Sequence, residues 1–464
     1  MPWISTPLSL TLPAVFDALA PDAVSMFWCD SADETQASTS RSMLTLELRL
    51  RARIEANATH APWAELDAHV ADFRAGEPGC PAGLVAWLSY EAGFIGTPLR
   101  CHRASLPSVE LYETLAALVV EEGRCALITR GDTLDQARAL ATTWRQKLAW
   151  LPNADARRRD AAIDNDVGAL RANAARPSLT VRQIGEQARY EAGIAEIQRA
   201  IAEGAIQQAC CTYPITFARP ARMERVYQAL RTTAPAAYCA FVRTPTLECA
   251  STSPECFFEL EGDRLRSRPM KGTRRRGTRP DHELAEELRA NPKDRAENAM
   301  IAEMVAEELR TICEPESVAI SKLFEVDILA NVLQMSSTVE GRVRDSIGPF
   351  EVFGALAPPG SMTGEPKAVA CALLRDLEEG PRGLYSGSIA WIDGADRASF
   401  SVVIRSLQAA GDEAAWHVGG GIVAASHPSS EWDESRAKAA TLLESPHIEG
   451  SWRAGSELER EDRD

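Results

Sequence analysis

The stretch Ser386-Gly-Ser-Ile-Ala-Trp-Ile-Asp-Gly394, followed by Ser399–Leu407, decides the fold class. Asp-Gly between two apolar, β-branched runs is a strong short-range sign of a β-hairpin, so the two runs are predicted to pair antiparallel. On the returning run, Arg405 is predicted to lie on the face opposite Phe400 and Ile404, because side chains alternate along a strand.

Other strand-like runs come as neighbours rather than in regular alternation with helices. They are Gly83–Leu88, Leu115–Val120, Gln207–Phe217, Tyr238–Arg243, Leu247–Ser251 and Phe257–Leu260. This order predicts an α+β protein with two packed antiparallel β-sheets and outer helices. Apolar residues at helical spacing predict helices over Tyr190–Ile201, Glu297–Cys313 and Glu431–Leu443, with Gly204 ending the first.

The chain has 464 residues, of which 45% are hydrophobic and 25% are charged, as in ordinary globular proteins. Its net charge of −16 argues against binding nucleic acid or anionic lipid surfaces. No apolar run is long enough for a membrane span, and the N-terminus lacks signal-peptide features. Eleven cysteines without a Cys-x-x-Cys pair predict a reduced, cytoplasmic protein.

Composition divides the chain into four parts. Residues 1–148 are predicted to form an N-terminal α+β region, 149–180 a polar linker or insertion, 181–448 the catalytic region, and 449–464 a charged tail. The residues that can carry chemistry lie almost entirely in the third part. They are found in Ser253–Phe258, Ser267–Thr273, Asp294–Met300, Gly360–Lys367, Tyr385–Gly387, Val403–Ser406, Gly419–Val423 and Glu431–Lys438.

Carboxylates on two predicted helices are candidate metal ligands. Glu297 opens one helix, whereas Glu431 and Glu434 lie three residues apart on the other and share a face, with Lys438 one turn further. Carboxylates without His or Cys select a hard cation, and Mg²⁺ accepts one or two of them together with water and substrate oxygens. Taken alone, Glu431 and Glu434 would be interpreted as part of a solvent-exposed helix face.

Glycines and an arginine are suited to binding an anion. The Gly360–Lys367 turn can present N–H groups and hydroxyls, and Gly419-Gly-Gly421 permits close backbone approach. Arg405 can bind a carboxylate through two parallel hydrogen bonds. Each glycine run by itself would more commonly be an ordinary turn.

Taken in order, these segments resemble the chorismate-binding enzymes over about residues 185–445, and the N-terminal Trp87–Glu91 matches more loosely. The resemblance implies the fold of anthranilate synthase component I. It implies Mg²⁺ held by Glu297 and Glu434 with Glu431 close by. It also places the chorismate carboxylates among Thr363, Gly364, Tyr385, Arg405, Gly420, Gly421 and Lys438.

Three further positions distinguish activities within the resembled family. Glu255 matches the general acid for departure of the C4 hydroxyl, which requires a raised pKa. Lys271, in Pro-Met-Lys-Gly-Thr, matches the lysine that attacks C2 in aminodeoxychorismate synthases, and nearby cations such as Arg268 would favour its neutral form. Gln208 stands where isochorismate and salicylate synthases carry a water-activating lysine.

Lys271 and Gln208 together predict a transferase of the aminodeoxychorismate synthase component I type. It would convert chorismate and ammonia to 4-amino-4-deoxychorismate for p-aminobenzoate and folate synthesis. No glutaminase motif is found, so the resemblance implies a separate glutamine amidotransferase subunit. The alternatives are an anthranilate synthase component I and a catalytically weakened chorismate-binding or regulatory subunit.

Departures from the family pattern motivate the alternative of a catalytically weakened chorismate-binding or regulatory subunit. Ala306–Thr311 replaces an Arg-Asn-Asp-Leu-Gly-Arg-like stretch. In the Gly360–Lys367 turn, Pro359 removes one N–H donor and Glu365 adds negative charge near the expected anion site. Gln334 stands where anthranilate synthases carry His, which suits the aminodeoxychorismate group.

Overall fold

The computed structural model describes residues 2–30, 41–56, 58–99, 101–151, 176–329 and 332–450. Most of the predicted linker 149–180 and of the predicted tail 449–464 therefore lies outside the described residues. Within these ranges no helix is both long and apolar enough to cross a membrane. All eleven cysteines are free thiols.

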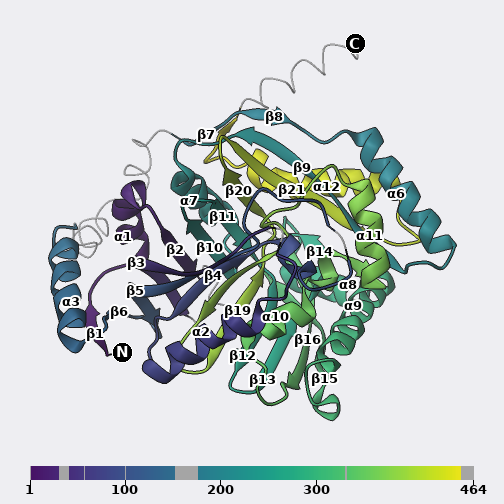
Figure 1. Cartoon of the computed structure of the whole chain (residues 1–464). Coiled ribbons are helices and arrows are strands. Elements are labelled where there is room, and N and C mark those ends of the chain that lie inside the picture. The colour runs from purple at the N-terminus through teal and green to yellow at the C-terminus, as the bar shows by residue number, and fades with distance from the viewer. Residues whose placement is uncertain are drawn as a thin grey trace.

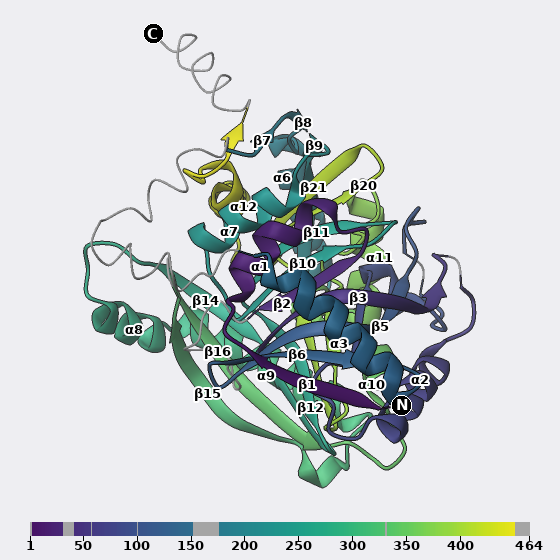
Figure 2. The same ribbon diagram turned by 90° about the vertical axis from the view of Figure 1, so that its left-hand side faces the viewer.

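The N-terminal part contains long strands flanked by helices (Figure 1). Its elements are β1 (Trp3–Leu8), α1 (Leu12–Leu19), β2 (Met26–Asp30), β3 (Arg41–Ile54), α2 (Trp63–Gly76), β4 (Leu84–Leu88), the short helix η2 (Tyr90–Phe94), β5 (Val109–Glu121), β6 (Arg124–Arg130) and α3 (Leu134–Ala149). Helices α1 and α3 cover these strands from the outside (Figure 2).

The C-terminal part alternates groups of strands with helices. Its elements are β7 (Ser178–Leu179), β8 (Val181–Gln183), α6 (Gln187–Ala202), β9 (Gln208–Ala218), α7 (Met223–Thr233), β10 (Tyr238–Arg243), β11 (Glu248–Ser253), β12 (Cys256–Glu261), β13 (Arg264–Arg268), β14 (Met270–Arg275), α8 (Asp281–Ala290), α9 (Pro292–Arg310), β15 (Ala319–Ile328), β16 (Val332–Arg342), α10 (Pro349–Leu356), η4 (Gly360–Met362), β17 (Gly364–Glu365), α11 (Lys367–Leu377), β18 (Ser388–Ile392), β19 (Arg397–Val402), β20 (Ser406–Ala410), β21 (Glu413–Ile422), α12 (Pro428–Leu443) and β22 (Glu449–Gly450).

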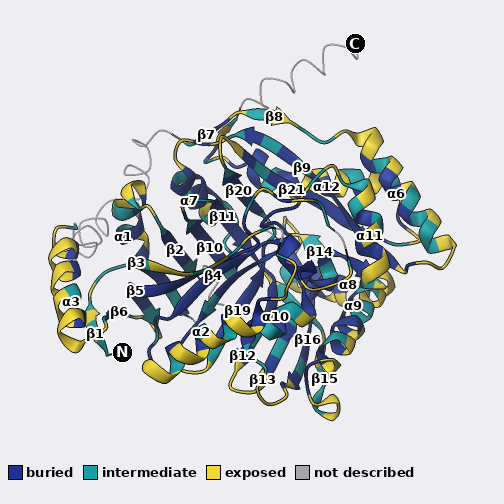
Figure 3. Cartoon of the chain, in the orientation of Figure 1, coloured by how far each residue is buried: buried dark blue, intermediate teal, exposed yellow. Residues whose placement is uncertain are grey.

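The predicted α+β class with antiparallel strands and outer helices is confirmed. Where two separate sheets were expected, the described strands join into one continuous hydrogen-bonded system of 20 strands, and only β7 and β22 pair apart from it, in parallel. The buried residues follow the strands through the middle of the molecule, and the exposed residues lie on the helices around it (Figure 3). Two large apolar clusters fill the interior.

Strands from both halves of the chain pair with one another. Strand β2 pairs with β10, and β4 pairs with β18. A side-chain bond reinforces this contact, because Thr246 donates to the buried carboxylate of Glu110 at 3.0 Å. The N-terminal strands therefore belong to the same sheet as the strands that carry the candidate site.

The hairpin predicted around Asp393-Gly394 is confirmed, since β18 and β19 pair antiparallel. The prediction of one continuous returning strand through Arg405 is wrong. Strand β19 ends at Val402, Arg405 adopts a φ of +49°, and β20 begins at Ser406. The break has a physical reason, because β19 pairs with β12 and β18 whereas β20 pairs with β11 and β21, so the chain changes neighbours at this bend.

The three predicted helices are present and all start earlier than predicted, α6 at Gln187 instead of Tyr190, and α9 ends at Arg310 instead of Cys313. Helix α9 begins at Pro292 because the Asn291 side chain accepts hydrogen bonds from the N–H groups of Lys293 and Asp294. Helix α12 begins at Pro428, whose ring suits the first helical position. Glu297 and Glu431 therefore lie inside their helices rather than at the first position.

Candidate active site

Lys271 lies on β14, where that strand bulges. A Cβ placed on Gly421 of β21 would be only 2.5 Å from the Lys271 Nζ and 3.8 Å from the Gln208 Oε1. Lys271, Gly421 and Gln208 of β9 are therefore brought together from three strands. A side chain at position 421 would push the lysine amine away from this place, so glycine leaves the room that the amine occupies.

Glu255 is buried just before β12, with 5% of its surface exposed. Its Oε1 accepts a hydrogen bond from the Ser361 hydroxyl at 2.7 Å. Burial raises the pKa of the Glu255 carboxyl to about 7, although the Ser361 bond and the charges of Lys271 and Arg405 oppose the rise. The carboxyl can thus hold a proton near neutral pH and release it nearby.

The carboxylates expected to bind metal come from α9 and α12. Burial raises the pKa of Glu297, and the negative charges of Asp294 and Glu431 add to this, whereas Lys271 and Lys293 oppose it. The charge of Lys438, whose Nζ is 2.9 Å from Glu434 Oε1, lowers the pKa of Glu434, and Lys271 acts in the same direction. Lys271 therefore faces carboxylates from both helices.

Glu431 is more firmly held than the other two carboxylates. It is 7% exposed, and its Oε1 accepts a bond from Ser426 at 2.7 Å. A Cβ on Gly420 would be 2.8 Å from the Glu431 Oε2, so Gly420 is needed for this carboxylate to approach. Lys438 donates to the carbonyl of Gly419 at 2.8 Å and caps the same region.

These side chains fit a hard divalent cation by their chemistry. All three offer carboxylate oxygens, and Glu297 and Glu431 are close enough to repel each other. In the described part of the chain no three His, Cys, Asp or Glu side chains converge as a metal cluster. Mg²⁺ requires only one or two protein carboxylates, because water and substrate supply the remaining ligands.

Arg405 lies at the strained bend between β19 and β20. Among the residues that the structure describes, its guanidinium forms no hydrogen bond or ion pair, and its carbonyl accepts from the N–H and hydroxyl of Thr252. Burial lowers the pKa of Arg405, with Glu255 opposing. A left-handed conformation at a non-glycine residue costs about 1–3 kcal/mol, so the surrounding contacts hold this arginine in place.

Tyr385 is buried and stacks on His417, with ring centroids 4.9 Å apart. Burial raises the pKa of the Tyr385 phenol and lowers the pKa of His417 to about 3, so both rings are neutral at pH 7. The next residue, Ser386, has a φ of +64°, and its N–H donates to the carbonyl of Val403. This hydrogen bond ties the Tyr385–Ser386 segment to the chain just before the bend at Arg405.

The Gly360–Lys367 turn closes one side of the site. The Thr363 hydroxyl is fully buried and donates to the carbonyl of Pro359 at 3.1 Å, so it braces the turn itself. Gly364 pairs with Ala209 of β9, and a Cβ there would be 2.2 Å from the Gln208 carbonyl. Lys367 anchors the far end of the turn by donating to Leu356.

Two sequence departures meet at this turn. Glu308, from the divergent Ala306–Thr311 segment, forms a 2.8 Å ion pair with Lys367. Burial raises the pKa of Glu365, and Glu307 adds to this effect. Glu308 therefore binds the lysine of the turn and stabilises the turn's conformation, whereas Glu307 repels Glu365.

Several residues at the site were missed in the sequence. Ser361 orients Glu255, and Asn298 contacts the backbone of Lys271. Arg382 is 1% exposed and donates to the carbonyls of Met362 and Cys210, to the Ser386 hydroxyl and twice to Glu378. Proximity to Tyr385 in the sequence was the only available signal for Arg382, and none existed for the partners of Asn298.

The cationic neighbours expected for Lys271 are bound elsewhere. Arg268 forms a 2.7 Å ion pair with Asp327, and Arg274 pairs with Glu287 and Asp294. The groups that act on Lys271 are instead carboxylates. The expectation that nearby cations such as Arg268 favour the neutral form of Lys271 stays a prediction.

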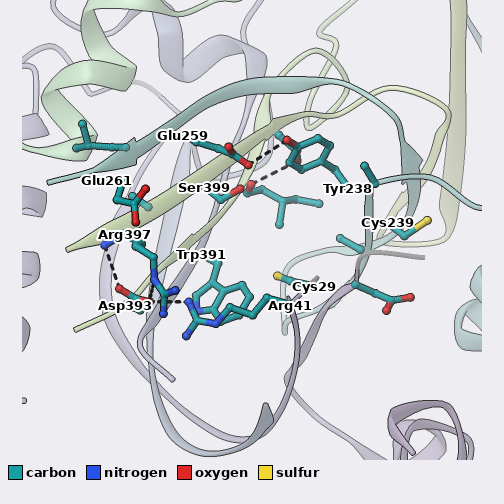
Figure 4. Close-up of a pocket in the computed structure, with 17 residues that line it drawn as sticks. Cys29, Arg41, Tyr238, Cys239, Glu259, Glu261, Trp391, Asp393, Arg397 and Ser399 are labelled. Atoms are coloured by element: carbon teal, nitrogen blue, oxygen red, sulfur yellow. Dashed lines mark hydrogen bonds and ion pairs between the residues drawn. The ribbon is translucent and has the colours of Figure 1, made fainter. Parts of the chain in front are cut away.

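A cavity of about 150 Å³ lies elsewhere, among β2, β10, β12, β18 and β19 (Figure 4). Inside it, Arg41 binds Asp393 at 2.6 Å and lies over the ring of Trp391, and the Tyr238 hydroxyl donates to Glu259 at 3.1 Å. None of the predicted site residues lines this cavity. It is separate from the arrangement around Lys271.

The fold and the lysine–glutamate arrangement agree with one class of protein. The sequence pattern described as chorismate binding enzyme matches residues 25–444, so the chain belongs to this family. The predicted family is thereby confirmed.

Individual relatives refine the comparison. The chain is 35% identical over 368 residues to an aminodeoxychorismate synthase of Streptomyces pristinaespiralis, covering 78% of this chain and 50% of that protein. It is 31% identical over 279 residues to an anthranilate synthase component 1 of Haloarcula marismortui, covering 59% and 56%. The chain spans about half the length of these curated relatives.

A solved structure supports the fold. Anthranilate synthase component I of Streptococcus pneumoniae superposes with a TM-score of 0.73 at 18% identity, over 87% of this chain and 92% of that one. At this identity the likeness establishes the fold alone, which agrees with the fold predicted from the sequence.

Proposed function

We propose that this chain aminates chorismate at C4 to give 4-amino-4-deoxychorismate, with Lys271 as nucleophile and Glu255 as general acid. The Lys271 amine forms a bond to C2, both ring double bonds shift by one position, and the C4–O bond breaks, so that the C4 hydroxyl leaves as water after receiving a proton from Glu255. Ammonia then forms the C4–N bond, both double bonds shift back, and the C2–N bond to Lys271 breaks. Atoms balance as chorismate plus ammonia giving product plus water.

The placement of Lys271 carries this proposal. Its Nζ reaches the backbone of Gly421, beside Gln208, and it faces Glu255, Glu297 and Glu434. Gln208 has no basicity with which to activate water, so a hydroxylation at this place is disfavoured. Relatives named aminodeoxychorismate synthase, at 35% and 36% identity, support the same chemistry.

Glu255 suits a general acid because its pKa is about 7. Such a group is protonated in a useful fraction at neutral pH and is still a moderately strong acid. Arg405, whose guanidinium has no partner within the ranges that the structure describes, would bind a substrate carboxylate through two hydrogen bonds. Tyr385, Thr363, Gly364, Gly420, Gly421 and Lys438 would surround the remaining polar groups of the substrate.

Mg²⁺ would be held by Glu297 and Glu434, with Glu431 close by. When bound, the ion would neutralise and orient a substrate carboxylate. The chain's own contribution is to keep these carboxylates on two helices that face Lys271, so that the anionic substrate enters a region balanced in charge.

The test is to incubate the protein with chorismate, Mg²⁺ and ammonium and to separate the products by chromatography. We expect 4-amino-4-deoxychorismate, and Lys271→Ala should lower its formation by about 10³-fold or more. Lys322→Ala, which removes an exposed lysine of β15, serves as the matched control. Unchanged output from Lys271→Ala would remove the lysine from the mechanism.

A second candidate is anthranilate synthesis, which the relative from Haloarcula marismortui favours by its name. Anthranilate together with released pyruvate would then be the main products of the same incubation. Chorismate binding without turnover would instead favour a weakened or regulatory subunit. We propose a separate glutamine amidotransferase subunit as the source of ammonia, with free ammonium replacing it in the assay.

A further inference from the structure

The bulge that carries Lys271 has a defined register. Met270 of β14 faces Ser336 of β16, and Thr273 faces Gln334, so Lys271 and Gly272 together oppose the single residue Met335. Gly272 has a φ of +94°, which suits glycine. A bulge of this kind interrupts the ladder and turns side chains away from their regular direction.

Asn298 of α9 bridges the two sides of this bulge. Its Nδ2 donates to the carbonyl of Lys271 at 3.4 Å and to the carbonyl of Met335, also at 3.4 Å. The amide is 1% exposed, and the fully buried Ser337 hydroxyl donates to its Oδ1. The orientation of the amide is thereby fixed, with both N–H groups directed at the bulge.

We propose that Asn298 is a positioning residue whose side-chain amide clamps the β14 bulge and thereby aims Lys271 at the carboxylates of the site. The residue before it on the helix is Glu297, so one turn of α9 sets both the lysine and a carboxylate that faces it. Among the described residues, the side-chain hydrogen bonds of Asn298 go to two backbone carbonyls and to Ser337. The inference rests on the proposed function in that Lys271 acts as the nucleophile.

The first test measures Lys271 without turnover. The intact protein is treated with trinitrobenzenesulfonate, and labelling of each lysine is followed by digestion and mass spectrometry. In Asn298→Ala, release of the bulge should raise the labelling rate of Lys271 about fivefold or more, because the amine is no longer held beside Gly421 and becomes more accessible to the reagent. Lys367, paired with Glu308, serves as the internal reference and should not change.

The second test separates positioning from binding. In Asn298→Ala, kcat should fall about 30-fold or more, since a displacement of about 1 Å can cost 10²-fold, while the dissociation constant of chorismate changes less than about threefold. Asn291→Ala is the matched control, because it removes an asparagine that caps the same helix. Its kcat and its Lys271 labelling should equal those of the native protein.

Equal behaviour of Asn298→Ala and Asn291→Ala in both measurements would overturn the proposal. If Asn298→Ala does not fold, Ser337→Ala carries the test, because it leaves Asn298 in place without its orienting donor and should produce the same changes at smaller size. If the native protein makes no aminated product, the proposed function fails, whereas the labelling comparison still decides the role of Asn298.

Discussion

Arg382, which is buried, and Arg405, which is half-buried, both lie near the Tyr385–Ser386 segment and differ in their hydrogen bonds. Arg382 donates to five acceptor atoms, including both oxygens of Glu378, and lies over the ring of Tyr90. Arg405 has no guanidinium partner in the described part of the chain, although it is held at a strained bend. We call Arg382 saturated, because its guanidinium N–H groups already donate to acceptors within the protein, and this arginine supports structure. We call Arg405 unsaturated, because its guanidinium retains its N–H groups for a ligand.

The largest effect is expected at the saturated arginine. Arg382→Met leaves Glu378 buried without its counterion and should lower the free energy of unfolding by about 3–5 kcal/mol. Arg375→Met, which removes a more exposed ion pair of α11, should cost no more than about 1 kcal/mol. Urea unfolding of both variants checks this. Similar losses for the two would contradict the structural role of Arg382.

The acid beside the unsaturated arginine should affect rate instead. Glu255→Gln should lower kcat by about 10²–10⁴-fold, because it removes the proton donor without removing the Ser361 contact. The native enzyme should lose kcat as pH rises above about 7, the pKa of Glu255, since the acid is then deprotonated. Glu261→Gln, at the end of the same strand, is the control. A flat profile between pH 6 and 9 would exclude Glu255 as the acid.

The unsaturated arginine itself should control substrate binding. Arg405→Lys keeps the charge but loses the two parallel hydrogen bonds, and should raise the dissociation constant of chorismate by about 10- to 100-fold. The urea midpoint should stay the same, in contrast to Arg382→Met. Calorimetric titration with chorismate measures the binding. A loss of stability without a loss of affinity would reverse the assignment of the two arginines.

The smallest effect concerns Glu91, whose carboxylate accepts a hydrogen bond from the backbone N–H of Arg382. Burial raises the pKa of Glu91 to about 7, so the native state keeps a proton that the unfolded state loses at a lower pH. Glu91 alone should therefore lower the free energy of unfolding as pH rises from about 4.5 to 7, by at most about 1.4 kcal/mol per pH unit, in addition to the contribution of Glu255. Glu91→Gln should flatten this slope in urea titrations, and Glu65→Gln should not.

Local sequence signals located much of the fold and the residues of the candidate site. Asp393-Gly394 predicted the hairpin, and apolar spacing predicted α6, α9 and α12. These signals succeed because turn chemistry and helical periodicity act over a few residues. Some of the residues matched to the family motifs also cluster, since Lys271 lies beside Gly421 and Gln208, and its charge lowers the pKa of Glu255.

Long-range pairing explains what the sequence did not predict. The bend at Arg405 exists because β19 and β20 pair with different strands, which alternation within one run cannot reveal. Asn298 reads as an ordinary helix residue until β16 supplies Met335 and Ser337. Arg382 likewise gains its partners from β9, α11 and the Gly360–Lys367 turn.

The interleaved strands carry a consequence for a broken backbone. Because β2 pairs with β10 and β4 pairs with β18, strands of each half of the chain depend on strands of the other half for their backbone hydrogen bonds. A protease that cleaved between residues 151 and 176 would therefore yield two fragments that stay associated as a heterodimer. Dilution would not release an active catalytic fragment, because each fragment needs the strands of the other to complete its sheet.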